Sequence, residues 1–326
     1  MKPYPLLFKP TLKQRIWGGS KIKEIFGYPS SYEYIGEAWV ASDHPEGKSL
    51  IINGEFSGES LDVLLAKCPE WFANINLKKF PLLVKLLDAN DNLSIQVHPD
   101  DEYAMRNENG ESGKAECWYV IDSEPGAEII LGHNARNRSQ FIQLSKENKW
   151  DELLVRVPAR AGDFFFIPSG TVHAIGKGIL LLEVQQNSDI TYRIYDYDRI
   201  GLGGRKRDLH FEKAIDVIDF QSTSYEPKPY TVEETGSAKT TLVACGYFTV
   251  EKWLINGSYN FKPFDVFLLI FVISGKGELI YNNGSILLTK GISIMIPANM
   301  DECQIVGKIE AIVSYSNYSP PHGSEI

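Results

Sequence analysis

Four side chains in three separate segments could together hold a metal ion. Gln96 and His98 are two positions apart in an apolar segment, and residues at that spacing in a β-strand point to the same face. Glu116 lies in a second strand-like segment, and His173 follows a turn after a third. Imidazole nitrogens and carboxylate oxygens suit zinc or another divalent first-row metal. If the strands deliver these groups to one interior point, they form an open metal site of the catalytic kind.

The alternative is that each histidine is an ordinary buried polar group, since short motifs of this kind often bind nothing. The sequence has only six histidines. His98 and His173 are in or beside predicted strands, with Glu116 between them in sequence. This setting favours the metal-site interpretation. The other histidines have no comparable setting and are interpreted as surface or core residues: His44, His133, His210 and His322.

The charge balance argues against a nucleic-acid partner. The net charge is −9, and no basic patch interleaved with aromatic residues occurs along the 326 residues. A small anionic substrate is compatible with this balance if its cleft is locally positive. Lys114, Arg193 and Arg199 lie in the motif-rich region and could supply that charge.

The apolar segments and the cysteines bear on the location of the chain. No apolar run approaches the roughly 20 residues that span a bilayer, so no membrane partner is expected. The first five residues include two prolines where a signal peptide would need an apolar stretch. The four cysteines are widely spaced and form no CxxC pair, which indicates neither a disulfide framework nor a thiolate zinc site. We therefore expect a reducing, cytoplasmic setting.

Strand-forming residues dominate, and helical patterns are few. Apolar spacing predicts helices within residues 60–72, 139–154 and 208–218, the last one capped by Asp208. A short helical turn is expected after Pro99. Trp17 and Trp39 could stack on a sugar, but a place in the core is the default. The rest of the sequence reads as short strands between turns, which favours a sandwich or a barrel.

A faint internal repeat relates residues 161–173 to residues 290–302. Gly162 aligns with Gly291, and Pro168 with Pro297. A glycine suits the tight turn into a strand, and a proline ends the strand. His173 aligns with Glu302, so the second copy is expected to keep the barrel and to lack the metal. The alternative is a coincidence between two segments that both run from glycine through a strand to proline.

Residues 225–237 carry two prolines, several charges and a Gly-Ser pair, a composition typical of a linker. A domain boundary near residue 230 follows from this interpretation.

Taken together, the motifs resemble those of the type I mannose-6-phosphate isomerases, in their compact bacterial form. The resemblance is carried by residues 96–99, 113–119, 168–174 and 192–199. The opening segments 15–19 and 36–42 resemble the N-terminal motifs of the same family. These matches occur in sequence order from about residue 15 to 220. Residues 231–326 resemble only a degenerate cupin barrel.

The resemblance implies a mainly β fold of two cupin (jelly-roll) barrels with a few short helices inserted. Residues 1–230 would form the metal-binding catalytic domain, and residues 231–326 a barrel without metal ligands. It also implies one zinc ion per chain and a sugar-phosphate substrate, in a monomer or homodimer. The implied zinc ligands are Gln96, His98, Glu116 and His173, the essential arginine is Arg193, and Lys114 is catalytic.

Aldose–ketose isomerisation moves a proton between adjacent carbons through an enediolate, whose negative oxygen the enzyme must stabilise. The planar donor fork of Arg193 could hold the enediolate or the phosphate. Lys114 could shuttle the proton or bind the phosphate, and these two roles stay open. Glu37 and Glu183 are further candidates for the base. The glycine-rich basic segment 201–207 is interpreted as a solvated loop rather than as a lid.

Two other functions have to be weighed against the isomerase. Two histidines and a glutamate also form the facial triad of iron-dependent oxygenases, although a glutamine ligand and the segment around Arg193 argue against that reading. A non-catalytic sugar-phosphate sensor on the same barrels is the third hypothesis. No DNA-binding segment supports it.

Overall fold

The fold is mainly β, as predicted. The computed structural model describes residues 2–73, 79–221, 227–263, 265–282 and 284–317. The chain forms two compact units, each built from more than one segment. The first unit contains Met1–Thr11, Trp39–Val84 and Pro227–Ile326, and the second contains Leu12–Ala38 and Lys85–Glu226.

A six-stranded sheet carries Glu116 and the buried acids and bases around it. The order of its strands is β10 (Phe164–Ile167), β7 (Glu116–Ser123), β12 (Ile179–Gln186), β5 (Leu82–Ala89), β3 (Glu37–Ala41) and β2 (Thr11–Lys13). Every residue of β12 is buried, so this strand is covered on both faces. The antiparallel register of β12 and β7 places Glu183 opposite Trp118.

A five-stranded sheet carries the other proposed ligands. Its order is β13 (Tyr192–Tyr195), β6 (Ile95–Val97), β11 (His173–Ile175), β8 (Glu128–His133) and β9 (Leu154–Pro158). Strand β6 pairs with β13 on one side and with β11 on the other. His173 of β11 and Arg193 of β13 both lie opposite Gln96. Residues that are far apart in the sequence are therefore neighbours on this sheet.

Apolar side chains from these two sheets form one core of the second unit. Trp118 and Val120 of β7 pack in the same cluster as Ile129 of β8 and Ile175 of β11. Trp17 belongs to this cluster, and Trp39 of the first unit is also buried, so both tryptophans are core residues, as expected by default.

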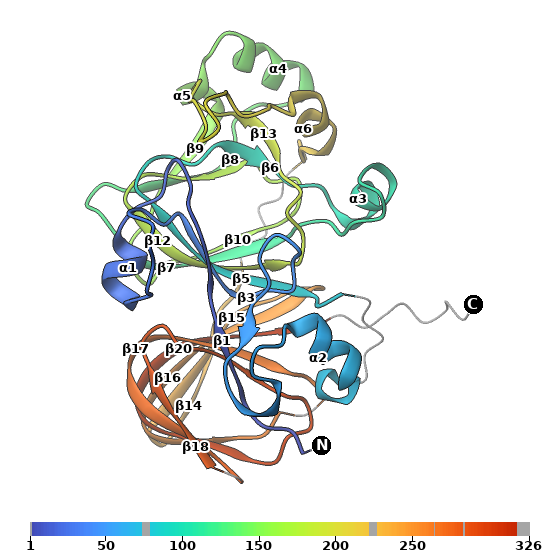
Figure 1. Cartoon of the computed structure of the whole chain (residues 1–326). Coiled ribbons are helices and arrows are strands. Elements are labelled where there is room, and N and C mark those ends of the chain that lie inside the picture. The colour runs from blue at the N-terminus through green and yellow to red at the C-terminus, as the bar shows by residue number, and fades with distance from the viewer. Residues whose placement is uncertain (1, 74–78, 222–226, 264, 283, 318–326) are drawn as a thin grey trace. The chain divides into compact units, whose positions relative to one another are not determined.

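Short helices provide a second apolar cluster with the five-stranded sheet. In Figure 1, α4 (Arg138–Lys146), α5 (Trp150–Leu153) and α6 (Phe211–Val217) lie beside the labels of β8, β9 and β13. Phe141 of α4 and Ile215 of α6 pack with Ile95 and Val97, the two residues that flank Gln96. The face of β6 opposite Gln96 is therefore held by helices.

The helix predictions were confirmed except for one cap. The segment 139–154 contains α4 and α5, and α3 (Asp101–Asn107) follows Pro99 with Asp100 accepting a capping hydrogen bond from Tyr103 N. Asp208 does not cap α6. The helix begins two residues later than that cap would require, with His210 at the cap position, because the Asp208 carbonyl accepts a hydrogen bond from Arg193. The second unit also contains α1 (Lys21–Phe26).

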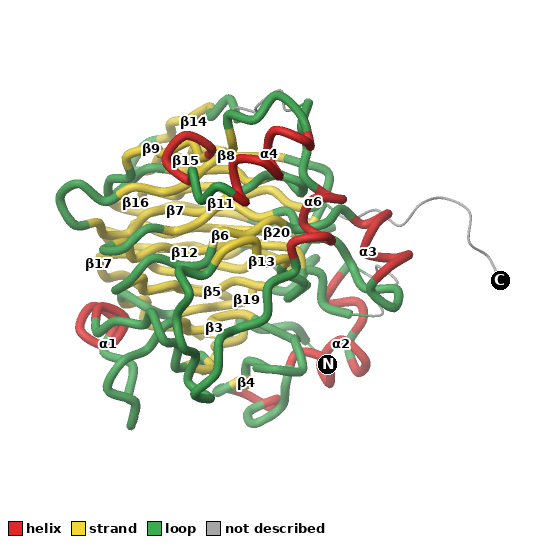
Figure 2. The backbone as a smooth tube through the Cα atoms, turned by 90° about the horizontal axis from the view of Figure 1, so that it is seen from above, coloured by secondary structure: helices red, strands yellow, loops and turns green. Residues whose placement is uncertain are grey.

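A nine-stranded sheet dominates the first unit. In Figure 2, where strands are yellow and helices red, strands clearly predominate over helices in the chain as a whole. The order of the strands in the nine-stranded sheet is β14 (Tyr230–Glu234), β15 (Ser237–Ala244), β16 (Phe248–Phe261), β20 (Cys303–Ser316), β17 (Leu268–Tyr281), β19 (Ser293–Ile296), β1 (Leu6–Lys9) and β4 (Leu50–Ile51), and β18 (Gly284–Thr289) pairs with β17. Among its described residues, this unit also contains the helical segments η1 (Gly54–Phe56), α2 (Leu61–Lys67) and η2 (Pro69–Phe72). The last two confirm the helix predicted within residues 60–72.

Three glycines cross the middle of the long strands in register. Gly257 of β16 lies opposite Gly307 of β20, which in turn lies opposite Gly277 of β17. A Cβ atom added to Gly307 would lie 2.5 Å from the Cα atom of Gly277. The backbones therefore approach closely along this row, as glycine allows at a bend in a sheet.

The linker prediction was wrong for residues 230–234. These residues form β14, which pairs with β15 in antiparallel register from Tyr230 to Glu234. The two prolines lie before the strand, so they do not interrupt its hydrogen bonds. Residues 225 and 226 of the predicted linker, and His322, lie outside the described residues. Within the described ranges, no helix combines the length and the apolar character needed to cross a membrane.

Candidate metal centre

The structure brings His98, Glu116 and His173 together at one buried point. One ligand atom from each lies within 4.8 Å of the other two. His98 Nε2 is 3.4 Å from Glu116 Oε2, and His173 Nε2 is 3.3 Å from Glu116 Oε1. All three side chains are almost completely buried. Glu116 is the first residue of β7, and His173 is the first residue of β11.

Both imidazoles are oriented by backbone carbonyl groups. His98 Nδ1 lies 2.8 Å from the carbonyl oxygen of Ile190, and His173 Nδ1 lies 2.8 Å from that of Thr171. A carbonyl group only accepts, so each Nδ1 carries the proton and donates it. The lone pair of each Nε2 therefore faces Glu116, which is the tautomer that a metal ligand needs.

The electrostatics keep the imidazoles neutral and the carboxylate charged. Burial, followed by the Lys114 ammonium, lowers the pKa of His98 to about 3. Burial also lowers the pKa of His173. Burial alone would raise the pKa of Glu116, but the Lys114 ammonium and the imidazoles hold it well below its usual value. Neutral imidazole and ionised carboxylate are the states that bind a divalent cation.

The donor set fits a metal ion. Within the part of the chain that the structure describes, neither carboxylate oxygen of Glu116 accepts a well-aligned hydrogen bond, although both are buried. A buried carboxylate without such partners requires a cation nearby, and the Lys114 ammonium, 2.9 Å from Oε2, supplies that charge in this structure. Two imidazole nitrogens and a carboxylate, with no thiolate among them, match zinc or a similar first-row ion.

Gln96 and Lys114 lie against this cluster. Gln96 Nε2 is 3.2 Å from His173 Nε2, and a half-turn of the amide would present Oε1 at the same place. Lys114 Nζ is 2.9 Å from Glu116 Oε2 and 3.1 Å from His98 Nε2. Lys114 is also buried, so its ammonium group balances the charge of Glu116 in this structure.

Arg193 lies on the neighbouring strand. Its backbone is opposite Gln96, but its guanidinium group is directed to other partners. Nε donates to Ser94 Oγ at 3.3 Å, and Nη1 donates to the Asp208 carbonyl oxygen at 2.8 Å. Arg199, the third cation named from the sequence, instead pairs with Asp196 at 2.7 Å.

Sequence reasoning missed Lys85. Its Nζ lies 2.7 Å from Glu183 Oε2, and Glu183 Oε1 accepts a hydrogen bond from Trp118 Nε1 at 3.0 Å. Both charged side chains are nearly buried. The available signal was a single lysine within the apolar run of β5. The pKa of Glu183 is raised, first by burial and then by the charge of Glu116.

The remaining sequence candidates lie in other settings. Glu37 pairs with Arg15 at 2.8 Å. The segment 201–207 is mostly exposed, as expected for a solvated loop, and Arg207 pairs with Asp196. His133 packs against Phe141.

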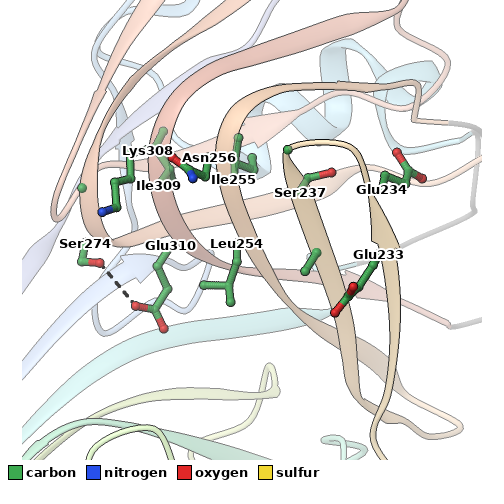
Figure 3. Close-up of a pocket in the computed structure, with 13 residues that line it drawn as sticks. Glu233, Glu234, Ser237, Leu254, Ile255, Asn256, Ser274, Lys308, Ile309 and Glu310 are labelled. Atoms are coloured by element: carbon green, nitrogen blue, oxygen red, sulfur yellow. Dashed lines mark hydrogen bonds between the residues drawn. The ribbon is translucent and has the colours of Figure 1, made fainter.

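A hollow in the first unit has a different character. It has a volume of about 560 Å³ and lies over β14, β15, β16, β17 and β20. In Figure 3, Ser274 donates a hydrogen bond to Glu310 at the edge of this hollow, and Leu254 lies between Glu310 and Glu233. Its lining residues include no histidine or cysteine, so it does not repeat the donor set of the second unit.

Comparison with protein families identifies the class of protein to which this site belongs. Residues 6–133 match the phosphomannose isomerase type I catalytic domain, and residues 238–316 match the mannose-6-phosphate isomerase cupin domain. The chain is 46% identical over 318 residues to mannose-6-phosphate isomerase ManA of Bacillus subtilis, which covers 97% of this chain and 100% of that protein. It therefore belongs to the type I phosphomannose isomerase family.

Other relatives agree over the same length. Mannose-6-phosphate isomerase of Streptococcus mutans is 45% identical over 313 residues, covering 96% of this chain and 98% of that protein. The crystal structure of the mannose 6-phosphate isomerase from Bacillus subtilis superimposes with a TM-score of 0.93 at 42% identity, covering 95% of this chain and 99% of that one.

Proposed function

We propose that this chain interconverts mannose 6-phosphate and fructose 6-phosphate at one zinc ion held by His98, Glu116, His173 and Gln96. The isomerase activity follows from family membership, at 46% identity over nearly the whole chain. The observation that carries the metal site is the buried convergence of His98, Glu116 and His173, with both Nε2 lone pairs turned toward one carboxylate.

The metal ion and the protein would contribute different parts of the catalysis. When bound, zinc supplies a Lewis acid that stabilises negative charge on a substrate oxygen. The backbone carbonyls of Ile190 and Thr171 keep the two imidazoles in the ligating tautomer. The burial of the site excludes water and strengthens each electrostatic contact within it.

Lys114 and Arg193 are the proposed catalytic residues. Lys114 contacts two of the proposed ligands, Glu116 and His98, so its side chain lies at the centre where the substrate would bind. To move the proton between the two carbons, Lys114 would act as the free amine, which takes the proton from one carbon and returns it to the neighbouring carbon. Arg193 retains donors on its guanidinium group for the phosphate or the enediolate. Glu183, paired with Lys85, and Glu37, paired with Arg15, are the further candidates for the base.

The architecture implied by the resemblance is part of the proposal. We propose two cupin barrels, with residues 1–230 acting as the catalytic domain and residues 231–326 as a barrel without metal. The cupin match at residues 238–316 supports the second barrel. The first compact unit combines segments from both ends of the chain. The proposed division at residue 230 therefore separates functions and does not follow the compact units.

The partners and the location are proposed on the same footing. A sugar phosphate is the expected small-molecule partner, and the net charge of −9 gives no support to a nucleic-acid partner. None of the four cysteines, all of them among the described residues, forms a disulfide bond, which is compatible with the proposed cytoplasmic location. A monomer or a homodimer is expected.

The experiment is a coupled assay with mannose 6-phosphate on the unaltered protein, before and after removal of metal by a chelator. Activity should disappear with the metal and return on addition of zinc, with about one ion per chain by elemental analysis. Full activity in metal-free protein would contradict the metal site. Restoration only by iron, with oxygen uptake and no sugar isomerisation, would favour the oxygenase, and tight binding without turnover would favour the sensor.

A further inference from the structure

The segment that carries Lys114 lies just outside the six-stranded sheet. Strand β7 begins at Glu116, which is paired with Ile167 of β10 on one side and with Gln185 of β12 on the other. Lys114 comes two residues before this strand, and its buried side chain contacts Glu116 and His98. Strand pairing therefore fixes Glu116, whereas the backbone at Lys114 depends on contacts of another kind.

Two side chains bind the peptide groups on both sides of Lys114. Gly113 N donates to Asp101 Oδ1 at 2.7 Å. Ala115 N donates to Gln186 Oε1 at 2.9 Å. The two acceptor side chains are also joined to each other, because Gln186 Nε2 donates to the same Asp101 Oδ1 at 3.0 Å. Asp101 and Gln186 thus form a bridge that spans Lys114.

Backbone contacts bring the same segment against the start of α3. Lys114 N donates to the Pro99 carbonyl oxygen at 3.0 Å. A Cβ atom added to Gly113 would lie 2.4 Å from the carbonyl carbon of Asp100. The absence of a side chain at Gly113 therefore lets the two backbone segments lie in direct contact.

Both members of the bridge belong to regular elements of the second unit. Asp101 is the first residue of α3, and Gln186 is the last residue of β12. Gln186 is buried, and its backbone N donates to the Ala115 carbonyl oxygen at 3.1 Å. A buried amide whose donor and acceptor ends are both bonded is held in one orientation. The bridge can therefore hold the backbone beside it in place.

A defined backbone matters for Lys114 because its side chain is long and flexible. Nζ lies 2.9 Å from Glu116 Oε2 and 3.1 Å from His98 Nε2. A displacement of a reacting group by about 1 Å can cost about 100-fold in rate. The contacts that hold the peptide groups beside Lys114 are thus placed to control its reaction geometry.

We propose that Asp101 and Gln186 are positioning residues, which hold the backbone on both sides of Lys114 so that its amine reaches the substrate carbons. This inference rests on the isomerase function and on the role of Lys114 proposed above. Neither residue needs to touch the substrate, because both act through Lys114.

The test measures kcat and KM of the zinc-loaded protein for mannose 6-phosphate, together with zinc content and urea unfolding. Gln186→Leu and Asp101→Ala each remove one member of the bridge. Each should lower kcat by about 10- to 100-fold with little change in KM, as expected for a displaced catalytic group. Zinc should stay at about one ion per chain, because Glu116 is held by strand pairing.

The deciding measurement repeats both changes in the Lys114→Met protein. A residue that acts through Lys114 has nothing left to position in that protein. Gln186→Leu and Asp101→Ala should therefore change the residual kcat of Lys114→Met by less than about 2-fold. A general loss of stability would instead lower the rate by the same factor in both backgrounds.

A conservative change and a matched control complete the test. Asp101→Asn keeps an oxygen that can accept the Gly113 N–H, so it should retain most of the kcat that Asp101→Ala loses. The control is Gln140→Leu on α4. Gln140 Oε1 also accepts a hydrogen bond from a backbone N–H, that of Arg136 at 2.7 Å, but this bond is exposed. Gln140→Leu should leave kcat unchanged.

Unchanged kcat in both single variants would overturn the positioning role, and so would equal losses with and without the Lys114 side chain. Equal losses in Asp101→Asn and Asp101→Ala, or zinc loss that accounts for the lost activity, would also overturn it. If one variant fails to fold, the other carries the same prediction.

Full activity of Lys114→Met would overturn this inference and leave the isomerase function standing. An unaltered zinc-loaded protein without isomerase activity would overturn the proposed function and this inference with it. The two failures are distinguishable, because only the second leaves the unaltered protein inactive.

Discussion

Two strand pairs in the molecule have the same backbone design and different chemistry. In the second unit, β10 pairs with β7, and in the first unit β19 pairs with β17. Gly162 N donates to the Val120 carbonyl oxygen at 2.8 Å, and Gly291 N donates to that of Val272 at 2.9 Å. The φ angles of these glycines are +93° and +87°. The predicted repeat is therefore confirmed at the level of the turn and the strand.

The two pairs differ at the positions that matter for metal binding. Ile167 of β10 lies opposite Glu116, whereas Ile296 of β19 lies opposite Leu268. The repeat aligns buried His173 with exposed Glu302. Leu268 instead packs in the apolar core of the first unit. The comparison teaches that the glycine turn and the proline-ended strand specify the frame, while single side chains on it decide whether the frame carries a metal site.

The largest expected effect is the loss of zinc and activity on replacing Glu116, compared with the same replacement at Glu302, the residue that the repeat aligns with His173. Glu116→Gln should remove the charged ligand, so bound zinc should fall well below one per chain and kcat/KM should drop by more than about 100-fold. Glu302→Gln, the same change on the second copy, should leave both unchanged. Elemental analysis and the coupled assay measure the two effects. Full zinc content in Glu116→Gln would contradict the proposed coordination.

The next prediction tries to break the comparison by placing a carboxylate on the second frame. Leu268→Glu puts a charge among the buried apolar side chains that form the core cluster of the first unit. The free energy of unfolding should fall by about 3–5 kcal/mol, as for an unpaired buried charge. Zinc content should stay at one per chain.

The control for this substitution is Leu268→Met, which keeps the volume and should cost less than about 1.5 kcal/mol. Thermal and urea unfolding followed by circular dichroism measure both variants. A second equivalent of zinc bound by Leu268→Glu would mean that the carboxylate alone defines the site.

Acid should destabilise the metal-free protein through its buried histidines. The pKa of His98 is about 3 in the folded chain because of burial and Lys114, and near 6.5 when unfolded. The unfolded state therefore binds the extra proton first, and the stability present above pH 6.5 is lost as the pH falls toward 3. Between pH 6.5 and 5 this one group should remove about 2 kcal/mol.

Urea unfolding of chelated protein at several pH values checks this. The slope below pH 6.5 should be smaller in His98→Gln, which has no proton to take up at that position. An identical pH dependence in the two proteins would show that His98 is not the group responsible.

The smallest effect concerns the shared turn. Gly162 has φ +93° and no atom within 4 Å of an added Cβ, so Gly162→Ala introduces backbone strain without a clash. It should lose about 1 kcal/mol, and Gly291→Ala should lose a similar amount. Gly246 has the same open surroundings without a positive φ, so Gly246→Ala should be neutral or slightly stabilising. Equal changes in the free energy of unfolding at all three positions would contradict the claim that the positive φ angle makes glycine necessary in the turn.

Much of the fold was predictable because its signals are local. Alternating and continuous apolar runs predicted a mainly β chain, and the spacing of Leu61, Leu64 and Leu65 predicted a helix whose apolar face is buried. Local signals failed where a long-range contact decided the outcome. The Asp208 carbonyl accepts a hydrogen bond from Arg193, and α6 begins after Asp208. Residues 230–234 form a strand because they pair with β15.

The site followed the same rule. The types of its ligands could be predicted from the sequence, since His98, Glu116 and His173 belong to motifs with characteristic neighbours. The role of Lys85 could not be predicted from the sequence, because the function of an isolated lysine in an apolar run depends on its ion-pair partner. Glu183, almost a hundred positions away, is that partner across the β5 and β12 strands.

The sequence by itself determined the identities of the donor groups, the family, and the glycine turns, because these depend on residue type and short spacing. Only the tertiary structure decided which way the imidazole lone pairs point, which cation faces each buried carboxylate, and how Arg15 reaches Glu37. Those outcomes depend on strand register and on backbone carbonyls from distant segments, and they arise when the sheets form and the side chains leave water.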